Sequence, residues 1–151
     1  MADLPGFRDV ETCNENHKRF VQRVVQNELV FALQGKKGIA FSPSNDAEGT
    51  DVLLFWSDAP YAKRARLEEF SEHQVHQIGL FDFLFRWLSG MEKDGVLAGT
   101  NWTADLVGLE ISPPQLKDEI LAELGPAKVK SYLERLAAEL EEQKRQRPPR
   151  S

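Results

Sequence analysis

The chain has 151 residues, of which 41% are hydrophobic and 28% are charged, so its composition is that of one globular domain and excludes a disordered or low-complexity protein. Its formal net charge is −5, and its longest apolar run, Leu80–Leu88, is broken by Asp82 and Arg86, which excludes a membrane span. The single cysteine, Cys13, cannot form an internal disulfide, and the first twelve residues lack a signal-peptide pattern, so we expect a cytoplasmic protein.

The first predicted element is a helix that starts at Thr12. Glu15 follows Thr12 by three residues, which is the spacing of a capping box at a helix N-terminus. Residues 1–11 are therefore predicted to be a flexible N-terminus. The helix carries an apolar stripe with the 3.6-residue period, on which His17 also lies: Cys13, Phe20, Val21, Val24 and Val25.

Two hairpin strands and a third strand are predicted to follow this helix. The apolar runs Leu29–Leu33 and Ile39–Phe41 enclose the polar, glycine-flanked segment Gln34–Gly38, which is typical of a β-hairpin. After a loop that contains Pro, Ser, Asn, Asp and Gly, the apolar run Val52–Trp56 has the length of a strand.

A second helix is predicted directly after the third strand. Asp58, or Ser57 just before it, is a suitable N-cap, and Pro60 fits the first helical turn because its missing N–H needs no partner there. The helix is expected to run to about Phe70, and the segment Gln74–Ile78 is expected to form a fourth strand.

The most apolar segment, Leu80–Leu88, is predicted to be a helix that ends at Gly90, a residue suited to a left-handed helix terminus. Phe83 and Phe85 spread its apolar surface beyond one face. The helix is therefore expected either to be buried on two sides or to be partly exposed to a partner.

Two strands and a capped helix are predicted next. The strands are Val96–Trp102 and Val107–Ile111, of which the second alternates cleanly between apolar and other residues. Ser112 is followed by two prolines and a glutamine, so it is a predicted N-cap for a helix that runs to Leu124.

A last helix is predicted over residues 125–145, followed by a disordered basic tail, 146–151. The apolar residues of this helix form one stripe: Val129, Tyr132, Leu133, Leu136 and Leu140. The stripe is expected to pack on its own domain, or else on a second copy or another protein. Residues 1–143 hold 15 basic and 24 acidic side chains, a net −9, which argues against a nucleic-acid partner.

This order of elements favours an α+β fold, with a single domain over residues 12–124 and an extra C-terminal helix. The helices and strands do not alternate regularly enough for a doubly wound parallel sheet. We expect a mostly antiparallel sheet of about five or six short strands, flanked by helices.

Several dispersed segments resemble the bacterial family called domain of unknown function 2750, over residues 16–124. These segments are Phe31-Ala32-Leu33 with the hairpin after it, Leu54 to Ala59, Tyr61-Ala62, Ile78, Leu80, Phe83, Trp87-Leu88, Asp94-Gly95 and Gly99 to Trp102. The resemblance implies a small bacterial cytoplasmic α+β protein and brings no catalytic or binding residues. A fainter similarity, to the N-terminal domain of SseB-type secretion-associated proteins, implies a protein-interaction module.

Two groups of residues with catalytic or metal-binding chemistry are better explained as structural. Cys13 and His17 share one helix face, but that face points into the core, where a thiol has no reason to ionise. His73 and His76, close to Glu72, are three residues apart in an extended segment, so they point to opposite faces and cannot chelate one metal. The sequence therefore predicts no catalytic residue, no metal and no cofactor.

The residues expected to line a ligand pocket are Trp56, Asn101 and Trp102, because strand-end aromatic rings beside an amide can hold a small ligand. The main prediction is nevertheless a non-catalytic module that binds another protein or a second copy of itself, without a membrane partner. Its candidate interface residues lie on the aromatic helix and on the leucine stripe: Phe83, Phe85, Leu133, Leu136 and Leu140. The alternative is a small-molecule-binding protein or a small hydrolase that uses the pocket.

Overall fold

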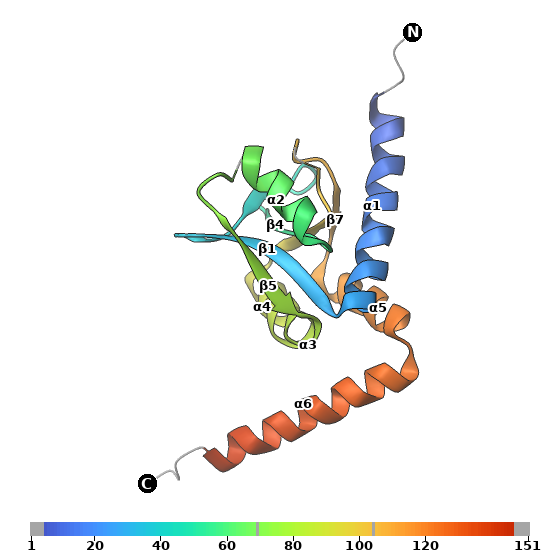
Figure 1. Cartoon of the computed structure of the whole chain (residues 1–151), viewed down its shortest axis with the longest axis vertical. Coiled ribbons are helices and arrows are strands. Elements are labelled where there is room, and N and C mark those ends of the chain that lie inside the picture. The colour runs from blue at the N-terminus through green and yellow to red at the C-terminus, as the bar shows by residue number, and fades with distance from the viewer. Residues whose placement is uncertain (1–4, 69, 104, 147–151) are drawn as a thin grey trace.

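Two β-sheets lie between helices in the molecule (Figure 1). The computed structural model describes residues 5–68, 70–103 and 105–146. One sheet has the order β2-β1-β5, and its strands are Gly38–Ile39, Leu29–Gly35 and Gln74–Gly79. The other has the order β3-β4-β6-β7, and its strands are Phe41–Pro43, Asp51–Phe55, Leu97–Thr100 and Leu109–Ile111. All pairs are antiparallel except the β4–β6 pair, so the predicted α+β class with mostly antiparallel strands is confirmed.

The chain after the predicted hairpin passes from one sheet to the other. Gly35 pairs with Gly38, as a β1–β2 hairpin requires. The Ala40 N–H then donates to the Leu33 carbonyl of β1 at 2.8 Å, while the Ala40 carbonyl accepts from the Leu54 N–H of β4 at 3.1 Å. The expected single sheet is therefore two, because an apolar run predicts a strand but not a change of pairing partner within it.

The sheets also meet at Phe31 and Trp56, whose backbones exchange two hydrogen bonds of 2.8 and 2.7 Å. Successive side chains along their strands point alternately into two hydrophobic cores, as strand geometry requires. Val30 and Ala32 of β1 belong to the larger core, and Leu33 belongs to the smaller one. Helix α2, Ala59–Glu68, covers the smaller core, and the other helices cover the larger one (Figure 1).

Helix α1 spans Pro5–Asn27 and starts earlier than predicted. Thr12 lies inside it, so the predicted start there is wrong, and residues 5–11 of the expected flexible segment are helical; residues 1–4 lie outside the described part of the chain. The physical reason is that proline at a first helical position is compatible with helix initiation, and the residues after Gly6 up to Thr12 are all tolerated in a helix. The helix ends before Glu28, which has a positive φ of 54°.

The aromatic segment also forms a longer helix than predicted. It consists of α3 (Leu80–Asp82), the π-helical turn η1 (Phe83–Trp87) and α4 (Leu88–Asp94). The predicted stop at Gly90 is wrong: the helix ends at Gly95, which has the left-handed φ of 70°. Both glycines suit a terminus, but only the second lies where the chain must turn into β6.

The last two helices follow their predicted boundaries closely. Helix α5 spans Pro113–Leu124, and the Ser112 hydroxyl accepts from the Gln115 N–H, which confirms the predicted cap. Helix α6 spans Pro126–Gln146 and extends as a long arm past α3 (Figure 1). Of the predicted disordered tail, Gln146 is helical and residues 147–151 lie outside the described part. Over the described residues, no helix combines the length and apolar character that a membrane crossing requires.

Helix α6 is attached to the body through Tyr132. The Tyr132 hydroxyl donates to the Glu28 carboxylate at 2.5 Å, and Lys128 lies 3.3 Å from the same carboxylate. The hydrogen bond from Tyr132 lowers the pKa of Glu28, burial works against this, and Lys128 adds to the lowering. Ionised Glu28 therefore favours the docked position of α6.

We predict that Tyr132→Phe makes the protein less sensitive to acid. A lowered pKa in the folded state means that Glu28 contributes stability above its ordinary pKa and loses it as the pH falls through the folded-state pKa. Removing the hydroxyl removes the largest cause of that lowering. Melting temperatures measured from about pH 6 to about pH 3 should therefore converge between wild type and variant. A temperature difference that stays constant with pH would contradict this.

Candidate functional site

Asn101 joins three segments that are far apart in the chain. It follows β6 in a left-handed conformation, with a φ of 50°, which asparagine tolerates better than most residues. Its Oδ1 accepts from the Ser57 N–H at 2.8 Å, and its Nδ2 donates to the Ser57 hydroxyl at 3.0 Å and to the Asn16 carbonyl at 3.3 Å. The ends of β4 and β6 are thereby held against α1.

The same network continues to an ion pair between α1 and the start of α2. The Ser57 hydroxyl donates to Asp58 at 2.7 Å, and Arg23 of α1 donates to Asp58 at 2.7 Å. Burial is the largest single effect on Asp58 and disfavours its ionised form. The hydrogen bonds from Arg23 and Ser57, with the charges of Arg23 and Arg19, outweigh it and lower the pKa of Asp58. The Asp58 side chain is thus used for this ion pair.

Two tryptophans pack beside this network. The indole N–H of Trp56 donates to the Trp102 carbonyl, and that of Trp102 donates to the Leu109 carbonyl, both at 2.9 Å. Gly99 and Gly108 flank the Trp102 ring so closely that a Cβ at either position would lie 2.6 or 2.1 Å from a ring atom. Trp56 is fully buried and Trp102 is 3% exposed. Both rings are therefore mainly core residues.

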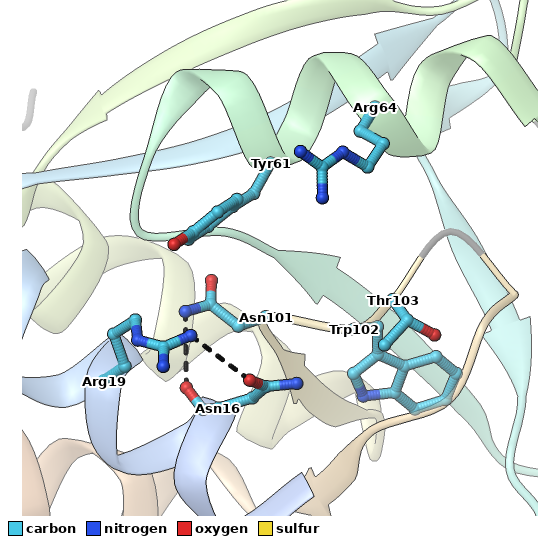
Figure 2. Close-up of a pocket in the computed structure, with 7 residues that line it drawn as sticks. All are labelled: Asn16, Arg19, Tyr61, Arg64, Asn101, Trp102 and Thr103. Carbon is cyan, nitrogen blue, oxygen red and sulfur yellow. Dashed lines mark hydrogen bonds between the residues drawn. The ribbon is translucent and has the colours of Figure 1, made fainter. Parts of the chain in front are cut away.

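A pocket of about 180 Å³ opens beside Asn101, between α1 and α2 (Figure 2). Its lining residues come from α1, from α2 and from the segment after β6: Asn16, Arg19, Tyr61, Arg64, Asn101, Trp102 and Thr103. In Figure 2, the α1 residues lie opposite the α2 residues, with Trp102 and Thr103 at one side. Two of the three expected pocket residues line it, and Trp56 does not.

The pocket presents mainly hydrogen-bond donors. Arg19 and Arg64 carry guanidinium groups, and Tyr61 carries a hydroxyl. None of the seven lining residues is acidic, so no pair of carboxylates for general acid and base catalysis meets here. The amide of Asn101 already bonds to Ser57 and Asn16, so it shapes the wall rather than offering free polar atoms.

Sequence reasoning missed the two arginines. They lie 45 positions apart, on separate helices, and each has the sequence context of an exposed helical charge. A signal for Asn101 did exist, because it stands between a strand and Trp102 in a segment with turn-forming residues. Nothing in the local pattern places either arginine near it.

His17 makes two short contacts inside the protein. Its Nδ1 lies 2.7 Å from the Thr100 hydroxyl, and its Nε2 lies 2.7 Å from Glu119 of α5. A hydroxyl, an imidazole and a carboxylate in contact are also the components of a hydrolase triad. Here Thr100 has no exposed surface, so a substrate cannot reach its hydroxyl. With both ring nitrogens engaged in this way, His17 is poorly placed to act as a base for Cys13, which is half-buried on the same helix.

The two other histidines have separate neighbours. His73 packs edge-on against Phe70, with ring centroids 5.2 Å apart, whereas the ring of His76 lies 6.1 Å from that of Trp87. Within the described residues, no three His, Cys, Asp or Glu side chains form a group that could hold a metal.

The candidate interface residues divide into a buried and an exposed set. Phe83 is fully buried, with its ring centroid 4.9 Å from that of Phe55, so its assignment to an interface is wrong. The prediction failed because the helix is buried on two sides. Phe85 is half-buried near the Tyr132 ring, and Leu136 packs on the larger core. Two interface candidates remain exposed, at 49% each: Leu133 and Leu140.

Comparison with known proteins identifies one family. The family model described as protein of unknown function (DUF2750) matches residues 17–120. No curated protein and no solved structure matches the chain. The matched span includes Asn101, Ser57 and every pocket-lining residue except Asn16, whereas α6 lies outside it.

We predict that Asn101→Ala destabilises the fold by about 2–5 kcal/mol. It leaves the buried Ser57 N–H without an acceptor, at about 1–3 kcal/mol, and places alanine in a left-handed conformation, at about 1–2 kcal/mol. Urea unfolding measures the loss. Asn101→Gly loses the same side-chain acceptor but has no steric cost in the left-handed conformation. Its free energy of unfolding should therefore lie between those of wild type and the alanine variant. An alanine variant within about 0.5 kcal/mol of wild type would show that the network is dispensable.

Gly108→Ala should destabilise the protein by about 1–3 kcal/mol, because the new Cβ overlaps the Trp102 ring. Gly90→Ala is the matched control: a Cβ there meets no atom within 4 Å, and Gly90 lies inside a helix. The control should therefore stabilise by about 0.5–1 kcal/mol. Chemical unfolding of both variants in parallel tests the comparison, and equal effects of the two would contradict it.

Proposed function

The chain belongs to the DUF2750 family of proteins of unknown function, and from the geometry of the pocket we propose that it binds a small anionic ligand, a carboxylate or a phosphate. One observation carries the proposal: two guanidinium groups from different helices, those of Arg19 and Arg64, line a single small pocket (Figure 2). Guanidinium groups form strong, often bidentate hydrogen bonds with carboxylates and phosphates.

Neither arginine of the pocket forms an ion pair among the described residues, although the charge of Arg19 also acts on Asp58. Arg23 lies nearby but is paired with Asp58 at 2.7 Å. Arg19 donates to the neutral amide of Asn16, at 3.4 Å. Among the described residues, no carboxylate lies within ion-pairing distance of Arg64. In a protein whose net charge is −5, a pocket with two positive charges favours an anion.

The size of the pocket limits the ligand. Its volume of about 180 Å³ is below the range of about 300–1,000 Å³ that is typical of sites for drug-sized molecules. The aromatic rings of Tyr61 and Trp102 provide apolar surface beside the arginines. A compact carboxylate or phosphate ester suits this combination better than a nucleotide does.

A second function, that of a protein-interaction module, is supported by a different observation. Leu133 and Leu140 on α6 are 49% exposed, which is unusual for leucines that share one helix face. This surface lies outside the family-matched span and on a different element from the pocket. The two proposals are therefore independent.

We predict that Arg64→Gln weakens anion binding by about 10- to 100-fold, the equivalent of one charged hydrogen bond of about 1.5–3 kcal/mol. Isothermal titration with inorganic phosphate and with benzoate measures the affinity and distinguishes the two ligand classes. Lys63→Gln is the matched control, because it removes one charge from the same helix without altering the pocket lining. Absence of saturable binding to wild type, or equal losses in both variants, would overturn the proposal.

A further inference from the structure

The contacts of α6 with the body fix which of its faces points outward. Arg135 lies over the Phe81 ring, 4.0 Å from its centroid, and Glu139 pairs with Arg86 at 2.7 Å. Tyr132 is buried, at 8% exposure. The predicted single stripe is thus divided: one part packs on the body, and the other part faces away from it.

The outward part forms an apolar strip, which we call the outer strip and define as Val129, Leu133, Ala137 and Leu140. The spacings of four, four and three residues keep these side chains on one helix face over about 16 Å. Val129, Leu133 and Ala137 also lie together on a shallow, open part of the surface, with Pro126, Lys130 and Glu134 beside them. Such a strip on a helix that is already attached elsewhere is typical of an interface.

The charges beside the outer strip indicate what covers it. Lys130, Glu134 and Glu141 lie along the same edge, at positions i, i+4 and i+11, and Glu141 also lies 3.7 Å from Lys144 of its own helix in an exposed ion pair. In a parallel two-fold pair, the edge that carries Lys130 and Glu141 would face the opposite edge of the partner's strip, which is already occupied because Tyr132 and Leu136 pack there on the body. In an antiparallel pair with its two-fold axis near residues 135 and 136, Lys130 of each copy lies beside Glu141 of the other.

We propose that the outer strip binds a second copy of the chain, through antiparallel pairing of the two α6 helices. The pairing buries both outer strips and places opposite charges together twice, as a two-fold axis requires. Acidic residues at the edge of the strip disfavour an anionic membrane surface as the occupant, because helices that bind such surfaces carry mainly Lys and Arg there. Four apolar residues per copy make a small interface, so the dimer is weak.

Sedimentation velocity of the full chain tests the proposal. The mass should rise toward twice 17.1 kDa between about 10 and 500 μM, the range expected for a small interface. Leu133→Glu combined with Leu140→Glu should weaken dimerisation at least 10-fold and leave the far-UV circular dichroism unchanged, because both side chains are exposed. Phe41→Glu, at another exposed apolar position, is the matched control and should dimerise like wild type.

Charge exchange tests the antiparallel arrangement. Lys130→Glu and Glu141→Lys should each weaken the dimer, because each places like charges together, and the double variant should restore it. A monomeric wild type at all concentrations, or a leucine variant that dimerises normally, overturns self-association and leaves a different protein as the occupant. A double variant that is not restored overturns the antiparallel arrangement.

Discussion

The side chain of Asn101 holds together parts of the chain that no local interaction connects. Its amide bonds to both the N–H and the hydroxyl of Ser57 after β4 and to the Asn16 carbonyl of α1, while its own backbone turns out of β6. Because Ser57 is almost fully buried, its polar groups need these partners. This amide acts together with the Arg23–Asp58 ion pair and the His17–Thr100 hydrogen bond to hold α1, and hence one wall of the pocket, against the sheet edge.

The two tryptophans belong to the same packed structure. Trp102 fits between Gly99 and Gly108, and its carbonyl accepts from Trp56, so these residues form one packed unit beside Asn101. Residues of two segments on which the sequence resemblance rests, Leu54 to Ala59 and Gly99 to Trp102, thus lie in this strand-end structure. The chemistry of the pocket comes from the neighbouring arginines, which are held near each other by the packing of α1 and α2 on this unit.

Two surfaces with different chemistry are built on this fold. The pocket lies between α1 and α2 and is basic and small, whereas the outer strip of α6 is apolar and flanked by both charges. The strip is available because Tyr132 and Leu136 already attach the other side of the helix to the body. The proposed ligand binding and the proposed self-association therefore rest on different residues and can be tested by separate substitutions.

Local signals determined most of the secondary structure from the sequence alone. The Ser112 cap and the hairpin around Gly35 and Gly38 were predicted correctly, because capping and turn formation act over a few residues. The starts and stops inferred at Thr12 and Gly90 were wrong for the same reason: a residue that suits a terminus is also tolerated inside a helix whose neighbours continue it.

Tertiary structure alone decided which residues form the site. The sequence indicated Asn101 and Trp102 as pocket residues but could not pair Arg19 with Arg64, since their proximity depends on how two helices pack on one sheet edge. Likewise, the period of α6 predicted an apolar stripe, but only the contacts of Tyr132 with Glu28 and Phe81 determined that Leu133 and Leu140 point outward. Periodicity defines the faces of a helix, whereas the packing energy of the whole fold selects the face that is buried.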